Sequence, residues 1–148
     1  AGRKECLPMK FWDSSALVPL IVMEKETAYC LKVLAEDRGM IVWCLSRVEI
    51  KSALCRRVRD GLMSDHDFQL AKKRMDTLMQ RAYEVTAVEK VRSRALRLLE
   101  VHPLTAADAC QLAAALVVSQ EDPAHLPIIT FDERLKEAAA KEGFVTNL

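Results

Sequence analysis

Short apolar segments alternate along this chain with longer segments in which apolar residues recur at helical spacing. The short segments are rich in residues that pack on a pleated surface, which predicts strands at 9–13, 40–43, 83–86, 127–130 and 144–145. The longer segments predict helices after 14–15, at 24–37 and 46–60, from 64 onward, and at 89–100, 105–119 and 132–141. Strands that are separated by one or two helices indicate an α/β fold with a parallel sheet and right-handed crossovers.

Local signals mark where several of these helices begin and end. Ser46 and Ser64 are each expected to cap the helix that they open, because a hydroxyl there accepts a free backbone N–H. Gly39 is expected to interrupt the chain after the helix at 24–37, and Gly61 to end the helix at 46–60.

Composition describes one ordinary soluble domain. The chain has 148 residues, of which 51% are hydrophobic and 29% are charged, while Gly and Pro are few. No apolar run approaches the roughly 20 residues that span a bilayer, so no membrane is expected. The opening AGRKECLPMK lacks the apolar run of a secretion signal. We expect residues 1–8 to be an N-terminal extension or an expression remnant, and 9–148 to form one domain.

The cysteines and histidines argue against a disulfide framework or a zinc site. The cysteine count is odd and no pair is spaced as CxxC; the five are Cys6, Cys30, Cys44, Cys55 and Cys110. Free thiols in apolar surroundings fit a reducing cytosol, hence a cytoplasmic location. The histidines match no ligand spacing and are expected at the surface; they are His66, His102 and His125.

The small net charge of +1 hides an uneven distribution. Residues 51–100 carry 12 Lys or Arg against 7 Asp or Glu, whereas residues 101–148 carry 3 against 7. A positive middle third suits a polyanion that approaches an acidic pocket. The uneven charge can also be explained by helix faces that are exposed to solvent.

Four acids stand beside or just inside apolar segments: Asp13, Glu49, Asp108 and Asp132. Carboxylates in such places are costly unless a cation or a ring of donors compensates them. In a parallel sheet all four would lie near one edge, where they would raise one another's pKa values unless a cation joined them. Oxygen ligands without His or Cys select Mg²⁺ or Mn²⁺.

Each acid also has a purely structural interpretation. Asp13 and Asp132 are natural N-caps, although Ser14 or Ser15 can cap the first helix instead. Asp108 follows Thr105 by three residues, as in a capping box. Glu49 lies inside its helix on a face shared with Leu45, Ser52 and Ala53, where a solvent-facing side chain paired with Arg56 remains open.

The motifs around these acids resemble those of PIN-domain ribonucleases, and within them the VapC toxins of bacterial toxin–antitoxin pairs. The matching segments are DSSAL at Asp13, SRVE at Glu49, AADACQLAAAL at Asp108 and TFDERL at Asp132. The resemblance implies that these four acids are catalytic and bind metal, and that the hydroxyls of Ser15 and Thr130 orient them. It also implies a three-layer sandwich with about five parallel strands, the first one central. In place of Thr105, many relatives carry an arginine.

The resemblance further implies a homodimer and a cognate VapB-like antitoxin, which threads a C-terminal segment toward the acidic pocket. The function expected is that of an endoribonuclease dependent on Mg²⁺ or Mn²⁺, the toxin of such a pair, in which one or two ions polarise a phosphate oxygen and supply hydroxide from bound water. Basic residues expected to guide the RNA phosphates are Arg56, Arg57, Arg59, Lys72 and Lys73.

Two other functions remain open at this point. A catalytically degenerate PIN-like module would bind RNA or a protein without cleaving. An aspartate-nucleophile phosphatase would use Asp13, but such enzymes usually need a second acid where Ser15 stands.

Overall fold

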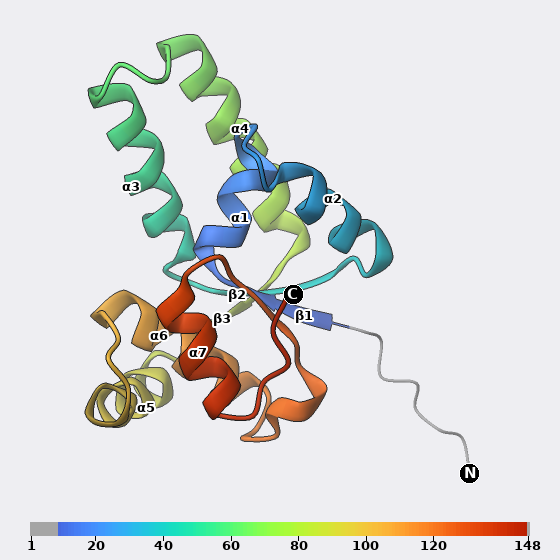
Figure 1. Ribbon diagram of the computed structural model, residues 1–148. Coiled ribbons are helices and arrows are strands. Elements are labelled where there is room, and N and C mark those ends of the chain that lie inside the picture. The colour runs from blue at the N-terminus through green and yellow to red at the C-terminus, as the bar shows by residue number, and fades with distance from the viewer. Residues whose placement is uncertain (1–8, 148) are drawn as a thin grey trace.

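The computed structural model describes residues 9–147, so the predicted N-terminal extension at 1–8 lies outside the described residues. Strands and helices alternate along the chain (Figure 1). In chain order they are β1 Met9–Trp12, α1 Ser14–Ile21, α2 Thr27–Glu36, β2 Gly39–Trp43, α3 Ser46–Arg59, α4 Asp65–Arg81, β3 Tyr83–Val85, α5 Val88–Val101, α6 Ala106–Val118, the 3₁₀ turn η1 Pro123–His125, β4 Ile128–Ile129 and α7 Glu133–Lys141.

The strands form one parallel sheet in the order β3-β2-β1-β4, with the first strand in its interior. The predicted α/β class and parallel sheet are confirmed. The sheet has four strands where about five were expected, because the segment at 144–145 does not form a ladder. Its Val145 carbonyl accepts the Ile128 N–H at 2.9 Å, and Thr146 makes a single parallel bridge to Ile128. Since β4 is only two residues long, its outer edge offers too little backbone for a full strand.

Alternating side chains along the strands build a core on each face of the sheet. Phe11, Ile41 and Ile128 pack with α5, α6 and α7, while the following residues Trp12, Val42 and Ile129 pack with α1–α4. This period of two is what a strand buried on both faces requires. Figure 1 shows the resulting three layers, with α1–α4 on one side of the sheet and α5–α7 on the other.

Two local predictions are wrong, and burial explains both. Ser46 does not cap α3: the helix begins after Leu45, and Ser46 lies fully buried in the first turn, where its hydroxyl accepts a hydrogen bond from Gln111. His102 is not at the surface, because it ends α5 in the interior, with Nε2 3.6 Å from Glu142. Ser64, by contrast, caps α4 as expected.

The cysteines in the described part of the chain are all free thiols; they are Cys30, Cys44, Cys55 and Cys110. Cys6 lies outside the described residues. No single helix within residues 9–147 has the length and apolar composition to cross a membrane; α5 and α6 meet that criterion only as a pair, bent by 118° between them.

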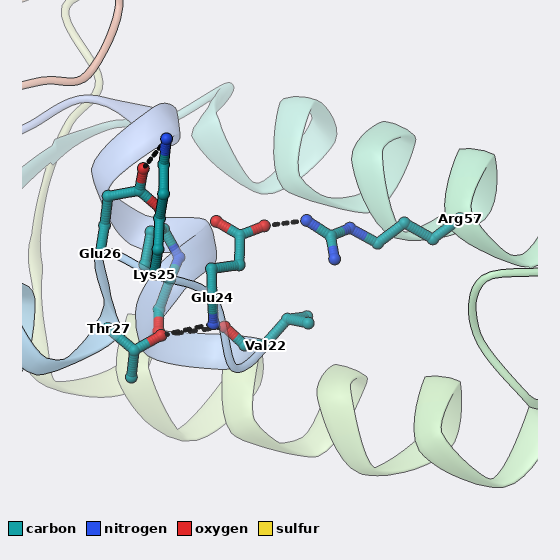
Figure 2. A network of polar contacts seen from close by, with 7 residues as sticks. Val22, Glu24, Lys25, Glu26, Thr27 and Arg57 are labelled. Carbon is teal, nitrogen blue, oxygen red and sulfur yellow. Dashed lines mark hydrogen bonds and ion pairs between the residues drawn. The ribbon is translucent and has the colours of Figure 1, made fainter.

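The turn between α1 and α2 is held by one buried hydroxyl (Figure 2). Thr27 Oγ1 donates to the Pro19 carbonyl at 2.7 Å and accepts the Glu24 N–H at 2.9 Å, with the Val22 carbonyl at 3.3 Å. The Glu24 carboxylate in the same turn pairs with Arg57 of α3. This turn therefore fastens the end of α1 that lies farthest from the sheet edge where α1 begins.

We expect Thr27→Val to lower the free energy of unfolding by about 1–2 kcal/mol, because the buried Pro19 carbonyl and the part-buried Glu24 N–H lose their partner. Urea unfolding measures the change. Thr77→Val is the matched control: its hydroxyl is exposed on α4 and bonds only to the Lys73 carbonyl, so a change within roughly 0.5 kcal/mol is expected. Equal effects of the two substitutions would show that the Thr27 network does not hold the turn.

Candidate active site

All four predicted acids stand at the start of a helix, as its N-cap or in its first turn, near the carboxyl edge of the sheet. Asp13 is the N-cap of α1 directly after β1, and Asp132 is the N-cap of α7 after β4. Glu49 and Asp108 lie in the first turns of α3 and α6. The positive end of a helix dipole favours a negative charge at each of these positions. Four helix N-termini thus serve the same group of carboxylates.

The pKa of Asp108 indicates that the four acids lie near one another. Burial, the largest cause, and repulsion from Asp132, Asp13 and Glu49 together raise the pKa of Asp108 to about 6. A hydrogen bond with the Thr105 hydroxyl lowers the pKa of Asp108 and opposes part of this rise. Such repulsion operates only between groups that lie near one another. The structure therefore brings together four carboxylates that are far apart in the sequence.

Asp13 is the most deeply buried of the four, with 2% of its surface exposed. Its Oδ2 accepts hydrogen bonds from Ser15 Oγ at 2.6 Å and Thr130 Oγ1 at 2.9 Å, and from the Ser15 N–H at 3.3 Å. Burial raises the pKa of Asp13, and these hydrogen bonds work against the rise. Asp13 is thus both the cap of α1 and a fixed carboxylate, and neither Ser14 nor Ser15 does the capping.

The two hydroxyls that hold Asp13 are themselves held by the chain between β4 and α7. Ser15 Oγ accepts the Phe131 N–H at 2.9 Å, and Thr130 Oγ1 accepts the Asp132 N–H at 3.1 Å. Each hydroxyl consequently donates to Asp13 while accepting from backbone. These bonds join the loops that carry Asp13 and Asp132.

Glu49 is held at both carboxylate oxygens. Its Oε2 accepts from Ser14 Oγ at 2.5 Å, and its Oε1 accepts from Gln111 Nε2 at 3.1 Å. Burial raises the pKa of Glu49, with a further contribution from the charge of Asp13. Glu49 therefore faces Ser14 and Gln111, and not Arg56.

Asp108 and Asp132 differ in how they meet their helices. Asp132 Oδ1 accepts the Leu135 N–H at 2.9 Å, as expected of an N-cap. At the start of α6 the cap is Thr105, whose hydroxyl accepts the Asp108 N–H at 3.2 Å. Asp108 therefore lies within the first turn of α6 and does not cap the helix.

The donor chemistry of the site fits a hard divalent cation. Carboxylate and hydroxyl oxygens are what Mg²⁺ and Mn²⁺ prefer, and the four acids carry more negative charge than their surroundings compensate. Within residues 9–147, however, no three Asp, Glu, His or Cys side chains are grouped closely enough to enclose an ion. Because hydrogen bonds hold Asp13 and Glu49, binding a cation at this edge requires Asp108 and Asp132 to move closer to them.

Three basic residues expected to contact RNA lie in the last turn of α3: Arg56, Arg57 and Arg59. The hairpin of α3 and α4 projects away from the sheet (Figure 1). Because Arg56 follows Glu49 by seven residues, it lies about 10 Å farther along the helix. Arg57 is paired with Glu24, as Figure 2 shows.

The other two expected contacts, Lys72 and Lys73, lie on α4. The Lys72 ammonium is 4.9 Å from the centre of the Phe68 ring, and that of Lys51 on α3 is 5.5 Å from the same ring. These lysines and the α3 arginines therefore belong to the projecting hairpin. They do not touch the carboxylates themselves.

Sequence reasoning missed three polar contacts of the site: those of Ser14, Gln111 and Asn147. Ser14 was considered only as a cap, yet its hydroxyl bonds to Glu49. Asn147 Oδ1 accepts the Thr130 N–H at 2.9 Å from the C-terminal end of the described chain. A signal did exist for Gln111, because it is the only polar residue between Asp108 and Ser119. A spacing of three places it on the Asp108 side of the helix.

We expect Asp108→Asn to stabilise the protein in EDTA. Between pH 3.8 and about 6 the folded protein binds more protons at Asp108 than the unfolded chain does, so stability falls as the pH rises through that window. Asparagine does not ionise and avoids this loss. Because the side chain is partly exposed, we expect a gain of about 1 kcal/mol at pH 7.

The gain should vanish near pH 4, where the wild-type carboxyl is protonated in the folded state. Thermal unfolding at pH 4 and pH 7 measures both values. Asp76→Asn, at an exposed position on α4, is the control and should leave stability nearly unchanged at either pH. A loss of stability on Asp108→Asn at pH 7 would contradict the repulsion described for this site.

Comparison with known proteins agrees with this architecture. The model of the PIN domain matches residues 10–141. Among solved structures, the fold is similar to PAE2754 from Pyrobaculum aerophilum, with a TM-score of 0.63 and 20% identity over 95% of this chain and 90% of that chain. It is also similar to FitAcB from Neisseria gonorrhoeae, with a TM-score of 0.66 and 13% identity over 95% and 97%.

A third similar structure is VapBC2 from Rickettsia felis, bound to a DNA fragment from their promoter, with a TM-score of 0.63 and 11% identity over 94% of this chain and 97% of that chain. At these identities the likeness shows the fold alone. No curated protein sequence matches this chain. The family match spans nearly all of the described residues and includes all four acids. The chain belongs to the PIN domain family.

Proposed function

We propose that this protein is a metal-dependent endoribonuclease, the toxin of a toxin–antitoxin pair. The observation that carries the proposal is the convergence of Asp13, Glu49, Asp108 and Asp132 at one edge of the sheet, where burial and the charges of the other three acids raise the pKa of Asp108 to about 6. PIN domains are generally nucleases. Four acids held together without a compensating cation are costly, and a divalent ion accounts for their retention.

The four acids would hold one or two Mg²⁺ or Mn²⁺ ions at this edge. Such an ion polarises a phosphate oxygen and lowers the pKa of bound water, so that hydroxide is present near neutral pH. Asp13 is fixed for this role by Ser15 and Thr130. Asp108, with its pKa of about 6, is mostly ionised at pH 7 and therefore ready to bind a cation.

This arrangement cleaves RNA without a catalytic histidine. His66 and His125 are exposed, and the buried His102 ends α5 beside Glu142. With hydroxide supplied by a bound ion, cleavage would need no 2′-hydroxyl of the substrate and would leave 5′-phosphate and 3′-hydroxyl ends. The positive α3–α4 hairpin lies beyond Glu49 and would guide the phosphates of an extended strand.

A protein partner follows from the same proposal. Two of the similar folds come from FitAcB and VapBC2, which supports a cognate antitoxin of the VapB type for this chain. We also propose that the protein acts in the cytoplasm as a homodimer. A small gene beside this one, encoding a DNA-binding protein that co-purifies with it, would support the pairing.

We expect Asp13→Asn to reduce cleavage of total RNA in Mg²⁺ or Mn²⁺ by at least about a hundredfold, because one charge of the cation site is removed at nearly constant shape. EDTA should abolish wild-type cleavage. Asp37→Asn is a matched control, since Asp37 is also buried but pairs with Lys10 at the opposite edge of the sheet.

The control should lose stability and keep its nuclease activity. Full Mg²⁺-dependent cleavage by Asp13→Asn would remove Asp13 from the mechanism. Calorimetric titration with Mn²⁺ decides between a nuclease and a degenerate binding module: wild-type protein that neither binds the ion nor cleaves RNA would overturn the proposed function.

We expect Arg56→Ala and Arg59→Ala each to weaken binding of single-stranded RNA and to reduce the slope of log K against log salt by about 0.7 per lost phosphate contact. Filter binding between low and moderate salt measures the slope. Arg97→Ala, on α5 across the sheet, should leave the slope unchanged. If all three variants behave alike, the α3–α4 hairpin does not guide the substrate.

A further inference from the structure

Gln111 is a buried amide whose two N–H groups both bond to residues of α3. Only 1% of its surface is exposed. Its Nε2 donates to Ser46 Oγ at 3.0 Å and to Glu49 Oε1 at 3.1 Å. A carboxylate only accepts hydrogen bonds, so the amide nitrogen must face Glu49. The orientation of the Gln111 side chain is therefore determined by its partner.

The other end of the same amide makes no hydrogen bond. Gln111 Oε1 is buried and has no partner among the described residues. An unpaired buried carbonyl lowers stability, and its neighbours on α6 are Cys110, Leu112 and alanines, among which an apolar side chain would pack without that cost. A glutamine here is therefore poorly explained by stability alone, and its two donated bonds are the alternative reason for its presence.

One of those bonds links Glu49 to the helix that carries Asp108. Gln111 follows Asp108 by three residues on α6, so the two side chains share one side of that helix. Glu49 on α3 accepts a hydrogen bond from Gln111 at Oε1 and one from Ser14 at Oε2. These two bonds leave its carboxylate little freedom to rotate. The hydrogen bond from Gln111 thus couples the position of Glu49 on α3 to that of Asp108 on α6.

We propose that Gln111 is a positioning residue of the acidic site: it holds the Glu49 carboxylate toward Asp108 so that a divalent cation meets a partly ordered set of ligands. The inference rests on the proposed metal-dependent function. Partners that orient a metal ligand typically change metal affinity by roughly 10–100-fold when they are lost. The role is distinct from binding the ion, because an amide nitrogen donates hydrogen bonds and is not a ligand.

The test compares Gln111→Met with the wild-type protein. Methionine has a similar length and no donor, so Glu49 loses one of its two restraints while the core remains filled. We expect Mn²⁺ affinity, measured by calorimetric titration, to fall roughly tenfold or more. Thermal unfolding in EDTA should show little loss of stability, because removal of the unpaired carbonyl offsets the lost bonds to Ser46 and Glu49. Gln111→Leu serves as a second donor-free variant if the methionine variant does not fold.

Thr27→Val is the matched control. It removes a buried hydrogen-bonding side chain at the far end of α1 (Figure 2). We expect it to lose stability and to keep wild-type Mn²⁺ affinity, the reverse of Gln111→Met. If both variants lose stability and neither loses affinity, Gln111 is merely structural and the inference is overturned.

A double-mutant cycle shows whether Gln111 acts through Glu49. In a Glu49→Gln background, Gln111→Met should weaken Mn²⁺ binding no further, because the carboxylate that Gln111 orients is gone. Additive losses would overturn the inference and leave the metal site intact. Wild-type protein that binds no Mn²⁺ would overturn the proposed function itself, together with this inference.

Discussion

Repulsion among four carboxylates at one sheet edge is the constraint on which the rest of this structure depends. Burial and the neighbouring charges together raise the pKa of Asp108 to about 6. The fold opposes this cost with donors that it supplies locally: the hydroxyls of Ser15 and Thr130 at Asp13, the hydroxyl of Ser14 at Glu49, and the first turns of four helices. These donors reduce the repulsion without removing it. The remaining charge is what would attract a cation in the proposed function.

The acids at this edge come from the two helical layers, two from each. Asp13 and Glu49 come from helices on one face of the sheet, whereas Asp108 and Asp132 come from helices on the other. The sheet therefore does more than fill the centre, because its carboxyl edge is where the two helical layers meet. A hydrogen bond from Gln111 on α6 to Glu49 on α3 passes directly between those layers. The relative position of α3 and α6 consequently matters to the spacing of the acids.

Periodicity and charge in the sequence were enough to predict four of the five expected strands, the parallel sheet and the four acids that converge. The predictions that were wrong all depended on a partner distant in the chain. Ser46 has the residue type of a cap, but it is buried against Gln111, 65 residues away. His102 is polar, but the end of α5 is covered by α7 and the residues after it. The segment at 144–145 is β-prone, but its neighbour β4 is too short to extend the sheet.

By itself, the sequence determined which segments form strands and helices, because the period of apolar residues records which faces are buried, and it determined which residue types stand at the helix starts. Only the tertiary structure decided which oxygen of each carboxylate is bonded and by which donor. Ser14 and Gln111 illustrate the reason: their side chains can bond to Glu49 only after the fold has brought α1 and α6 to the start of α3. Hydrogen bonds act over about 3 Å, and such proximity between distant residues is a property of the packed chain alone.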